Sequence, residues 1–137
     1  MLFRSNYFKD EANIIDFFEG VARGIKEISD LGFVHRDLKT ENIVLKSIAG
    51  STKLKPLIID FDLSCKKGQS TELIGTLKTM DAFIIKTSLE KKNPVYFYDT
   101  SNDVYAFGVT LYEVLFEGIV PFYDTRLDIK QIGRAHV

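Results

Sequence analysis

The sequence predicts an α+β fold that is mainly helical and contains one short β-hairpin. Residues 10–31 have apolar side chains at three- and four-residue intervals, which indicates an amphipathic helix. Residues 100–116 are apolar around most of a helical circumference, which indicates a helix covered on nearly every side. The runs 43–45 and 57–59 are short and apolar, as in strands. A chain of 137 residues, 45% of them hydrophobic, is long enough for one domain with its own core.

The first helix is predicted from its ends as well as from its apolar stripe. Asp10 is a candidate N-cap, because a short carboxylate can accept from the amides of the first turn. Gly32 is a candidate stop, because glycine tolerates a left-handed backbone. The residues of the apolar stripe are Ile14, Phe18, Val21, Ile25 and Ile28.

A polar octapeptide, residues 35–42 with the sequence HRDLKTEN, follows this helix. Loops between regular elements often carry function. Asp37 can accept a proton or position a hydroxyl group, Lys39 can neutralise a phosphate, and Asn42 can offer an amide oxygen to a hard cation. The octapeptide resembles the catalytic loop of protein kinases, His-Arg-Asp-x-Lys-x-x-Asn, and further motifs in the family's order extend the resemblance over most of residues 10–123.

The resemblance implies the C-terminal (large) lobe of a protein kinase-like fold, with the N-terminal lobe and the last helices missing. It implies phosphoryl transfer from ATP to serine or threonine hydroxyls of a protein substrate, with Mg²⁺ as the metal. Asp37 and Lys39 would be catalytic, and Lys39, Asn42 and Asp60 would bind the nucleotide. Asn42 and Asp60 would bind the metal. Residues 1–131 would form this partial catalytic domain, inactive in isolation.

The polar connection 46–56 joins the two strands, and the second strand leads into the tripeptide 60–62, Asp-Phe-Asp. Kinases most often have Asp-Phe-Gly here, so Asp60 corresponds to the metal ligand and Phe61 to the residue that packs behind it. Asp62 replaces the glycine and should narrow the backbone conformations of this turn. By the same resemblance His35 is a structural residue that packs near Phe61.

Residues 63–79 are polar and contain glycine, as a mobile segment would. In them, Gly-Thr at residues 75 and 76 resembles the dipeptide that follows the kinase activation loop. Thr76 would hydrogen-bond Asp37 and Lys39, a pattern of kinases that phosphorylate serine or threonine rather than tyrosine.

Arg36 precedes the catalytic aspartate, as in kinases whose activation loop is ordered by a phosphate group. Ser70 or Thr71 would carry that phosphate. The carboxylate of Glu72 is an alternative, since a fixed negative charge nearby could partly replace the phosphate.

The resemblance is weaker at residues 80–83 (MDAF), the nearest match to the family's Ala-Pro-Glu, and residues 83–93 look like an insertion. It returns at residues 99–108, where Thr100 or Ser101 is expected to cap a helix. Asp103 would accept hydrogen bonds from the loop backbone near Arg36. Gly118 is expected to end the helix, before a turn at residues 121–122. The apolar positions of this helix are Val104, Phe107, Val109, Leu111, Val114 and Leu115.

Charge and cysteine content limit the possible partners. The net charge of −1 indicates neither nucleic acid nor an anionic membrane as a partner. The single cysteine, Cys65, excludes an internal disulfide and suits a reducing, cytoplasmic location. We expect neither a signal peptide nor a membrane span.

Residues 132–137 (IGRAHV) match the translation of a common sequencing adapter, so we expect this tail to be non-native and assign no role to His136. If the large lobe lacks its last helices, the apolar surface of residues 104–116 predicts aggregation or poor folding of the fragment alone.

Two other functions stay open. A catalytically silent, kinase-like regulatory or scaffold module is favoured by Asp62 and by the weak match at residues 80–83. A small-molecule phosphotransferase of related fold is a third possibility, but such enzymes usually lack the pattern of Arg36 and Lys39.

Overall fold

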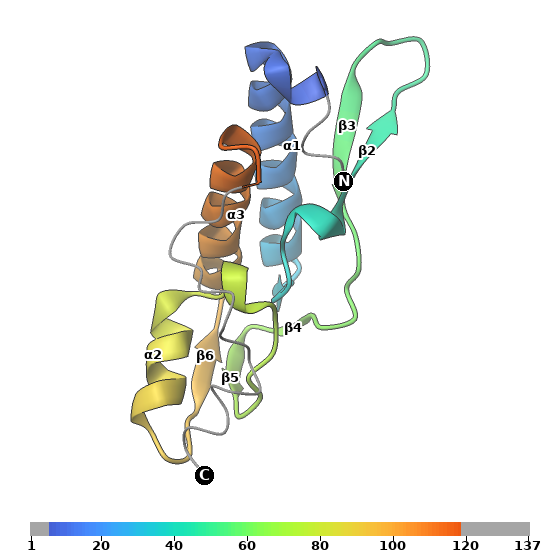
Figure 1. The fold of residues 1–137 in the computed structure, drawn as a ribbon. Coiled ribbons are helices and arrows are strands. Elements are labelled where there is room, and N and C mark those ends of the chain that lie inside the picture. The colour runs from blue at the N-terminus through green and yellow to red at the C-terminus, as the bar shows by residue number, and fades with distance from the viewer. Residues whose placement is uncertain (1–5, 119–137) are drawn as a thin grey trace.

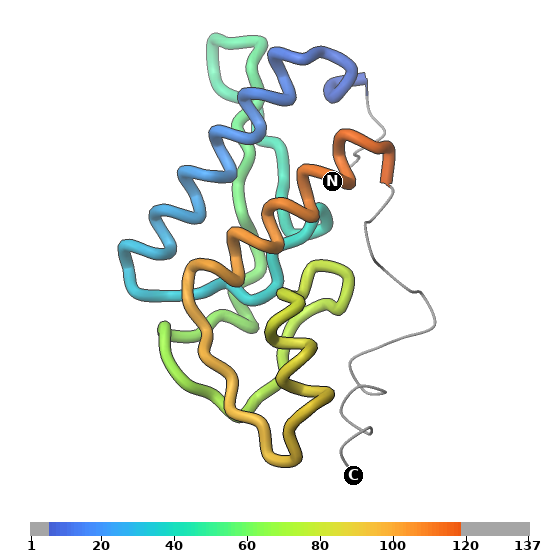
Figure 2. The backbone as a smooth tube through the Cα atoms, turned by 90° about the vertical axis from the view of Figure 1, so that its left-hand side faces the viewer, coloured from blue at the N-terminus to red at the C-terminus, as the bar shows by residue number. Residues whose placement is uncertain are grey.

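The computed structural model describes residues 6–118, which form three α-helices and three two-stranded antiparallel sheets. α1 (Glu11–Asp30) and α3 (Thr100–Leu115) lie side by side and run in opposite directions (Figures 1 and 2). The hairpin of β2 (Ile43–Ser47) and β3 (Leu54–Ile58) lies beside α1. The predicted class, helices with a short hairpin, is therefore present.

The other end of the molecule contains α2 (Ala82–Glu90) and the sheet of β5 (Gly68–Ser70) with β6 (Tyr96–Tyr98) (Figure 1). A third, very short sheet pairs β1 (Phe33–Val34) with β4 (Cys65–Lys66) between the two ends. The 3-10 helices are η1 (Asn6–Lys9), η2 (Thr40–Asn42) and η3 (Leu77–Thr79).

α1 begins and ends where the sequence predicts. Oδ1 of Asp10 accepts a hydrogen bond from the amide of Ala12 at 2.9 Å, and Gly32 has a φ of 83° after the last turn. The buried face differs slightly from the predicted stripe, because Phe17 is completely buried while Ile14 and Phe18 are only partly buried against the core. Val21, Ile25 and Ile28 are buried as expected.

α1 approaches β3 closely because two of its residues are glycines. A Cβ atom at Gly20 would lie 2.3 Å from Cγ of Pro56, and one at Gly24 would lie 2.8 Å from Cδ1 of Ile58. The ring of proline cannot rotate away, whereas the end of an isoleucine side chain can. Gly20 therefore sets the distance between the helix and the hairpin.

Gly20→Ala is expected to lower the free energy of unfolding by about 1–3 kcal/mol, because overpacking outweighs the gain in helix propensity. Gly108 in α3 is a matched control, since an added Cβ would meet nothing within 4 Å outside its own helix among residues 6–118. Gly108→Ala is expected to raise that free energy by up to about 1 kcal/mol. Urea denaturation of both variants measures the difference, and a more stable Gly20→Ala protein would contradict the close approach.

The hairpin strands are longer than predicted. Ile43 pairs with Ile58 and the register continues to Ser47 opposite Leu54, so the connection is only residues 48–53 rather than 46–56. The sequence prediction missed these pairs because they include lysines and a proline, which are poor strand formers. Pro56 is tolerated because β3 is an edge strand, where a missing backbone donor costs little. The Pro56 ring packs on Gly20 of α1.

The segment 63–79 is not uniformly irregular, and its mobility stays a prediction. β4 pairs with β1, and β5 pairs with β6, with Gly68 opposite Tyr98 and Ser70 opposite Tyr96. These strands are two or three residues long and their partners are distant in the sequence. A local pattern therefore does not reveal them.

α3 is capped by Asp99 rather than by Thr100 or Ser101. Oδ1 of Asp99 accepts from the amide of Ser101 at 2.8 Å, and the side chain of Asn102 accepts from the amide of Asp99 at 2.8 Å, which completes a capping box. The helix ends at Leu115, followed by a hydrogen bond from the amide of Gly118 to the carbonyl oxygen of Glu113 at 2.8 Å. The turn expected at residues 121–122 lies outside the described residues.

The core has two parts. One part joins α1, the loop of residues 35–42 and α3, around residues such as Phe17, Leu38 and Ile43. The other part lies around Val34 and the sheet of β5 and β6. Among the described residues α3 is covered on one side only, and Val104 and Leu115 are half exposed.

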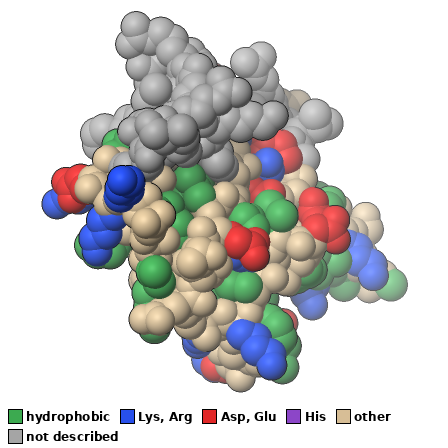
Figure 3. All heavy atoms as spheres, turned by 90° about the horizontal axis from the view of Figure 1, so that it is seen from below, with side chains coloured by type: hydrophobic (Ala, Val, Ile, Leu, Met, Phe, Trp, Pro, Cys, Tyr) green, Lys and Arg blue, Asp and Glu red, His purple; other side chains and the backbone are tan. Residues whose placement is uncertain are grey.

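α2 begins at Ala82 and covers most of residues 83–93, which the sequence marked only as an insertion. Asp81 caps it by accepting from the amide of Phe83 at 2.8 Å, and the side chain of Phe83 is exposed. Seen from below, hydrophobic side chains reach the surface in several separate places (Figure 3). Within residues 6–118, none of the helices combines the length and the apolar character needed to cross a bilayer.

Candidate catalytic site

The candidate site is the loop of residues 35–42, which lies between the two ends of the molecule (Figure 1). β1 leads into the loop and β2 follows it, so both ends of the loop are fixed by strand pairing. Leu38 anchors the loop in the core, where it is 1% exposed.

His35 is completely buried and uses both ring nitrogens. Nδ1 accepts from the amide of Asp37 at 3.1 Å, so Nε2 carries the proton and donates to the carbonyl oxygen of Ile59 at 2.9 Å. The Phe61 ring packs edge-on against this imidazole, with 5.1 Å between ring centroids. His35 thus links the loop to the Asp-Phe-Asp turn through a neutral ring.

Asp103 supports the loop backbone from α3. Its buried carboxylate accepts from the amide of His35 at 2.8 Å and from the amide of Arg36 at 3.1 Å, the contacts that the sequence led us to expect. Burial raises the pKa of Asp103, and the two hydrogen bonds oppose this shift only in part. Arg36 has a φ of 69°, so the carboxylate holds a backbone conformation that is unfavourable for arginine.

Three polar side chains gather around Asp37. Oδ1 of Asp37 accepts from the hydroxyl of Thr76 at 2.6 Å, and that hydroxyl accepts from Nζ of Lys39 at 2.9 Å. The Asn42 amide nitrogen lies 2.8 Å from the backbone oxygen of Asp37 and 3.2 Å from Oδ2. Asp37, 8% exposed, is therefore fixed at both carboxylate oxygens, and the hydrogen bonds expected for Thr76 are present.

Gly75 allows Thr76 to reach the loop. It has a φ of 128°, and a Cβ atom at this position would lie 2.6 Å from the carbonyl oxygen of Arg36. Only glycine combines this conformation with this approach of two backbones. Local sterics thus explain why glycine precedes Thr76 in this chain.

Arg36 contacts protein groups on both sides of its guanidinium. Nε donates to the carbonyl oxygen of Leu63 at 2.7 Å, and Cζ lies 4.9 Å from the centroid of the Tyr98 ring. The Tyr98 hydroxyl donates to the carbonyl oxygen of Glu72 at 2.8 Å. Tyr98, which the sequence analysis missed, connects Arg36 to the segment of the expected phosphosites.

The expected phosphosites Ser70 and Thr71 lie at and just after the end of β5. Oγ of Ser70 accepts from the amide of Glu72 at 3.1 Å, and Thr71 and Glu72 are exposed. Phosphorylation at either residue, and the alternative role of Glu72, stay predictions.

The tripeptide 60–62 lies beside the loop because the amide of Ile59 donates to the backbone oxygen of Asn42 at 2.8 Å. Asp60 has a φ of 61° and accepts from the amide of Asp62 at 3.3 Å. The three residues are exposed, Phe61 by 49%. Asp60 follows β3 by two residues rather than ending a buried strand as expected.

The donors near this turn fit Mg²⁺ with two protein ligands. The Asn42 amide nitrogen contacts Asp37, so the amide oxygen could act as a cation ligand, and Asp60 offers an exposed carboxylate. No group of three or more His, Cys, Asp or Glu side chains within residues 6–118 forms a metal-binding cluster. Such a site suits Mg²⁺ shared with phosphate oxygens, since this cation often takes only one or two carboxylates from protein.

A second charged group, which the sequence analysis missed, lies next to the loop. Nζ of Lys78 lies 2.8 Å from Oε1 of Glu41 and 3.5 Å from Oε1 of Glu113. The Thr40 hydroxyl lies 3.1 Å from Oε2 of Glu41 and 3.4 Å from Oε2 of Glu113, and can donate to either. A lysine in a polar stretch is normally a surface residue, so no signal in the sequence indicates that Lys78 is buried.

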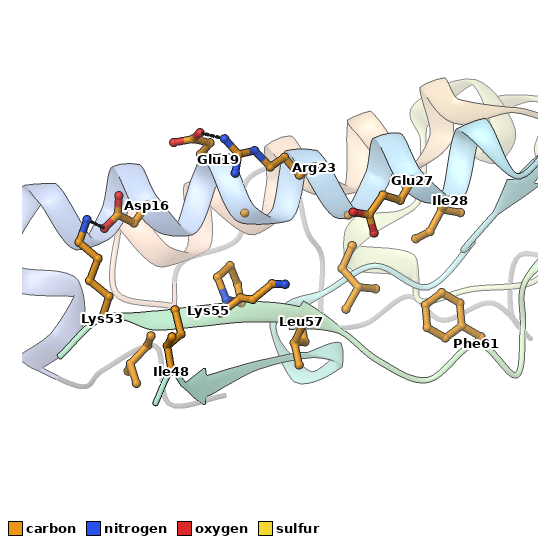
Figure 4. Close-up of a pocket in the computed structure, with 15 residues that line it drawn as sticks. Asp16, Glu19, Arg23, Glu27, Ile28, Ile48, Lys53, Lys55, Leu57 and Phe61 are labelled. Carbon is orange, nitrogen blue, oxygen red and sulfur yellow. Dashed lines mark hydrogen bonds and ion pairs between the residues drawn. The ribbon is translucent and has the colours of Figure 1, made fainter. Parts of the chain in front are cut away.

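A groove between α1 and the hairpin, with a volume of about 510 Å³, lies away from this loop (Figure 4). Lys53 and Asp16 form an ion pair across it at 4.0 Å, and Phe61 lies at its other end. Asp37, Lys39 and Asn42 do not line this groove. It is therefore separate from the candidate catalytic residues.

Comparisons with known proteins agree with the loop motif. The family model of the protein kinase domain matches residues 1–136. The chain is 37% identical over 112 residues to cysteine-rich receptor-like protein kinase 45 of Arabidopsis thaliana, covering 75% of this chain and 27% of the relative. It is 33% identical over 124 residues to serine/threonine-protein kinase PSK1 of Saccharomyces cerevisiae, covering 89% and 8%.

A third relative is human calcium/calmodulin-dependent protein kinase type 1B, 33% identical over 116 residues that cover 85% of this chain and 30% of the relative. The chain therefore spans less than a third of the length of each of these relatives. Members of the matched family transfer phosphoryl groups with ATP and a divalent metal. From the domain match and these relatives, the chain belongs to the protein kinase family.

Proposed function

We propose that the full-length protein transfers the γ-phosphoryl group of ATP to serine and threonine hydroxyls of protein substrates. The observation that carries this proposal is the hydrogen-bonded group of Asp37, Lys39, Thr76 and Asn42. Phosphoryl transfer needs positioned charge more than covalent chemistry, and this group provides a fixed carboxylate with a cation beside it.

Asp37 would orient the substrate hydroxyl and accept its proton as the phosphoryl group moves. The Thr76 hydroxyl and the Asn42 amide restrain the two carboxylate oxygens, so little reorganisation is needed when the substrate binds. Nζ of Lys39 lies 3.7 Å from Oδ1 of Asp37 and would steady the negative charge of the transferred group. The contact of Lys39 with Thr76 supports serine or threonine as the acceptor.

Asn42 and Asp60 would hold Mg²⁺, which neutralises charge on the nucleotide phosphates when bound. Lys39, Asn42 and Asp60 would form the described part of the ATP site. Residues 1–131 would be part of the large lobe, completed by a small lobe in the full-length protein. The tail 132–137, which we propose to be non-native, lies outside the described residues.

A transfer assay with labelled ATP, Mg²⁺ and a pool of serine, threonine and tyrosine peptides tests the proposal on the full-length protein. We expect label on serine and threonine, and its loss when EDTA removes the metal. Label on tyrosine alone would overturn the acceptor assignment.

The second candidate is a catalytically silent regulatory or scaffold module. It is favoured by Asp62 in place of the family's glycine, and by the exposed Phe83 near the place where the family has an anchoring glutamate. An absence of transfer by the wild-type protein, unchanged in an Asp37→Asn variant, would favour this function.

A further inference from the structure

The ion-pair group of Lys78 joins three elements that are distant in the sequence. Lys78 belongs to η3, Glu41 to η2 in the candidate catalytic loop, and Glu113 to α3. The Lys78 side chain is 15% exposed and that of Glu113 is 4% exposed. The charges of Lys78 and Glu113 are therefore largely removed from water, whereas the Glu41 side chain is 55% exposed. Breaking a buried ion pair by removing one partner is costly, because the other charge is left without compensation.

The pKa values of two of the three groups are shifted in favour of their charged forms. The pKa of Lys78 is raised, and the pKa of Glu41 is lowered because the effect of burial is outweighed by its hydrogen bonds and by the charge of Lys78. Burial acts to lower the pKa of Lys78, but its hydrogen bond with Glu41 and the charge of Glu113 outweigh burial, so the pKa lies above its ordinary value. Burial raises the pKa of Glu113, against the effect of the Lys78 charge. The ammonium group is thus shared by two carboxylates.

The backbone of η3 has few hydrogen bonds of its own, although Thr79 within it and Met80 just after it are buried. Its own backbone bonds run from the amide of Thr79 to the oxygen of Thr76 at 3.1 Å and from the amide of Met80 to the oxygen of Leu77 at 3.2 Å. A single 3-10 turn with two bonds is weak by itself. It also follows Gly75, whose backbone is the least restricted of any residue.

Thr76 is two residues before Lys78, at the start of this turn. Its hydroxyl must stay within hydrogen-bond distance of both Asp37 and Lys39, at 2.6 and 2.9 Å. A small movement of η3 would break both contacts.

We propose that Lys78 is a positioning residue, whose ammonium group between Glu41 and Glu113 fixes η3 where Thr76 reaches Asp37 and Lys39. The catalytic consequence rests on the proposed kinase function, whereas the positioning of η3 does not. Lys78 itself does not contact the reacting groups.

Amide hydrogen exchange of the full-length protein tests the positioning directly. We expect Lys78→Met to speed exchange at the amides of Thr79 and Met80 at least about tenfold, with no change at Val21 in α1. Glu113→Gln should also speed exchange at these two amides. This second variant keeps the test valid if the Lys78→Met protein folds poorly. Lys86→Met is the matched control, because Lys86 is 66% exposed and only 4.0 Å from Glu90 on the same helix.

Kinetics test the catalytic consequence. In Lys78→Met, kcat should fall about tenfold or more while the KM for ATP is unchanged, since a misplaced Thr76 disturbs the transfer step. Lys78→Arg should restore both kcat and slow exchange, which loss of packing alone would not explain. Unchanged exchange at Thr79 and Met80 in both Lys78→Met and Glu113→Gln overturns the proposal. An inactive wild-type protein would instead contradict the kinase function and leave the exchange result valid.

Discussion

Replacing Asp37 by asparagine is expected to lower kcat for phosphoryl transfer by about 10²–10⁴-fold, because the amide cannot accept the proton of the substrate hydroxyl. The variant should remain folded. Its amide oxygen can still accept from Thr76, and Asn42 keeps its 2.8 Å bond to the backbone oxygen of residue 37. The contact between Asn42 and Oδ2 and the 3.7 Å ion pair with Lys39 are lost, at a stability cost of about 1 kcal/mol.

Steady-state transfer rates and thermal unfolding, measured on the same preparation of the full-length protein, separate these two effects. Asp30→Asn is the control, since Asp30 is an exposed carboxylate paired with Lys26 on α1. Wild-type transfer rates in Asp37→Asn would show that Asp37 is not the proton acceptor.

The largest expected effect on stability is that of Asp103→Ala, which should lower the free energy of unfolding by about 3 kcal/mol or more. The substitution removes two hydrogen bonds to a charged acceptor. The backbone amides of His35 and Arg36 then have no carboxylate to donate to in a largely buried environment. Removing a buried charge offsets part of this loss, as the raised pKa of Asp103 indicates. The positive φ of Arg36 would lose its support at the same time.

Urea denaturation measures the loss, with Glu27→Ala on the exposed face of α1 as the control. Asp103→Asn keeps one oxygen as an acceptor and should be intermediate, which gives a measurable value if the alanine variant does not fold. Equal stability of wild type and Asp103→Asn would mean that one of the two backbone contacts contributes nothing.

The elements that the sequence predicted well are those whose signals are local. α1 is predicted from apolar side chains that recur at helical intervals, from Asp10 as its N-cap and from Gly32 just after its last turn. The prediction missed Phe17, which is completely buried, while the predicted Phe18 is partly buried against the core. The short strands β1, β4, β5 and β6 could not be predicted, since pairing with a distant segment, and not composition, makes them strands.

The candidate site shows the same division. The octapeptide and the Gly-Thr dipeptide are sequence motifs, so the sequence alone predicts that Asp37, Lys39, Asn42 and Thr76 belong to one site. Lys78 and Tyr98 carry no motif, and their importance depends on which buried groups surround them. Such residues are found from burial and partners alone.

The two- and three-residue pairings of β4 and β5 imply a region that opens independently of the rest of the domain. Each sheet is too small to be stable alone, so residues 65–70 are expected to detach at a lower free energy than the helices unfold. Modifying enzymes require an extended, accessible peptide. Ser70, one of the two predicted phosphosites, would then become accessible during brief openings while α1 and α3 remain packed.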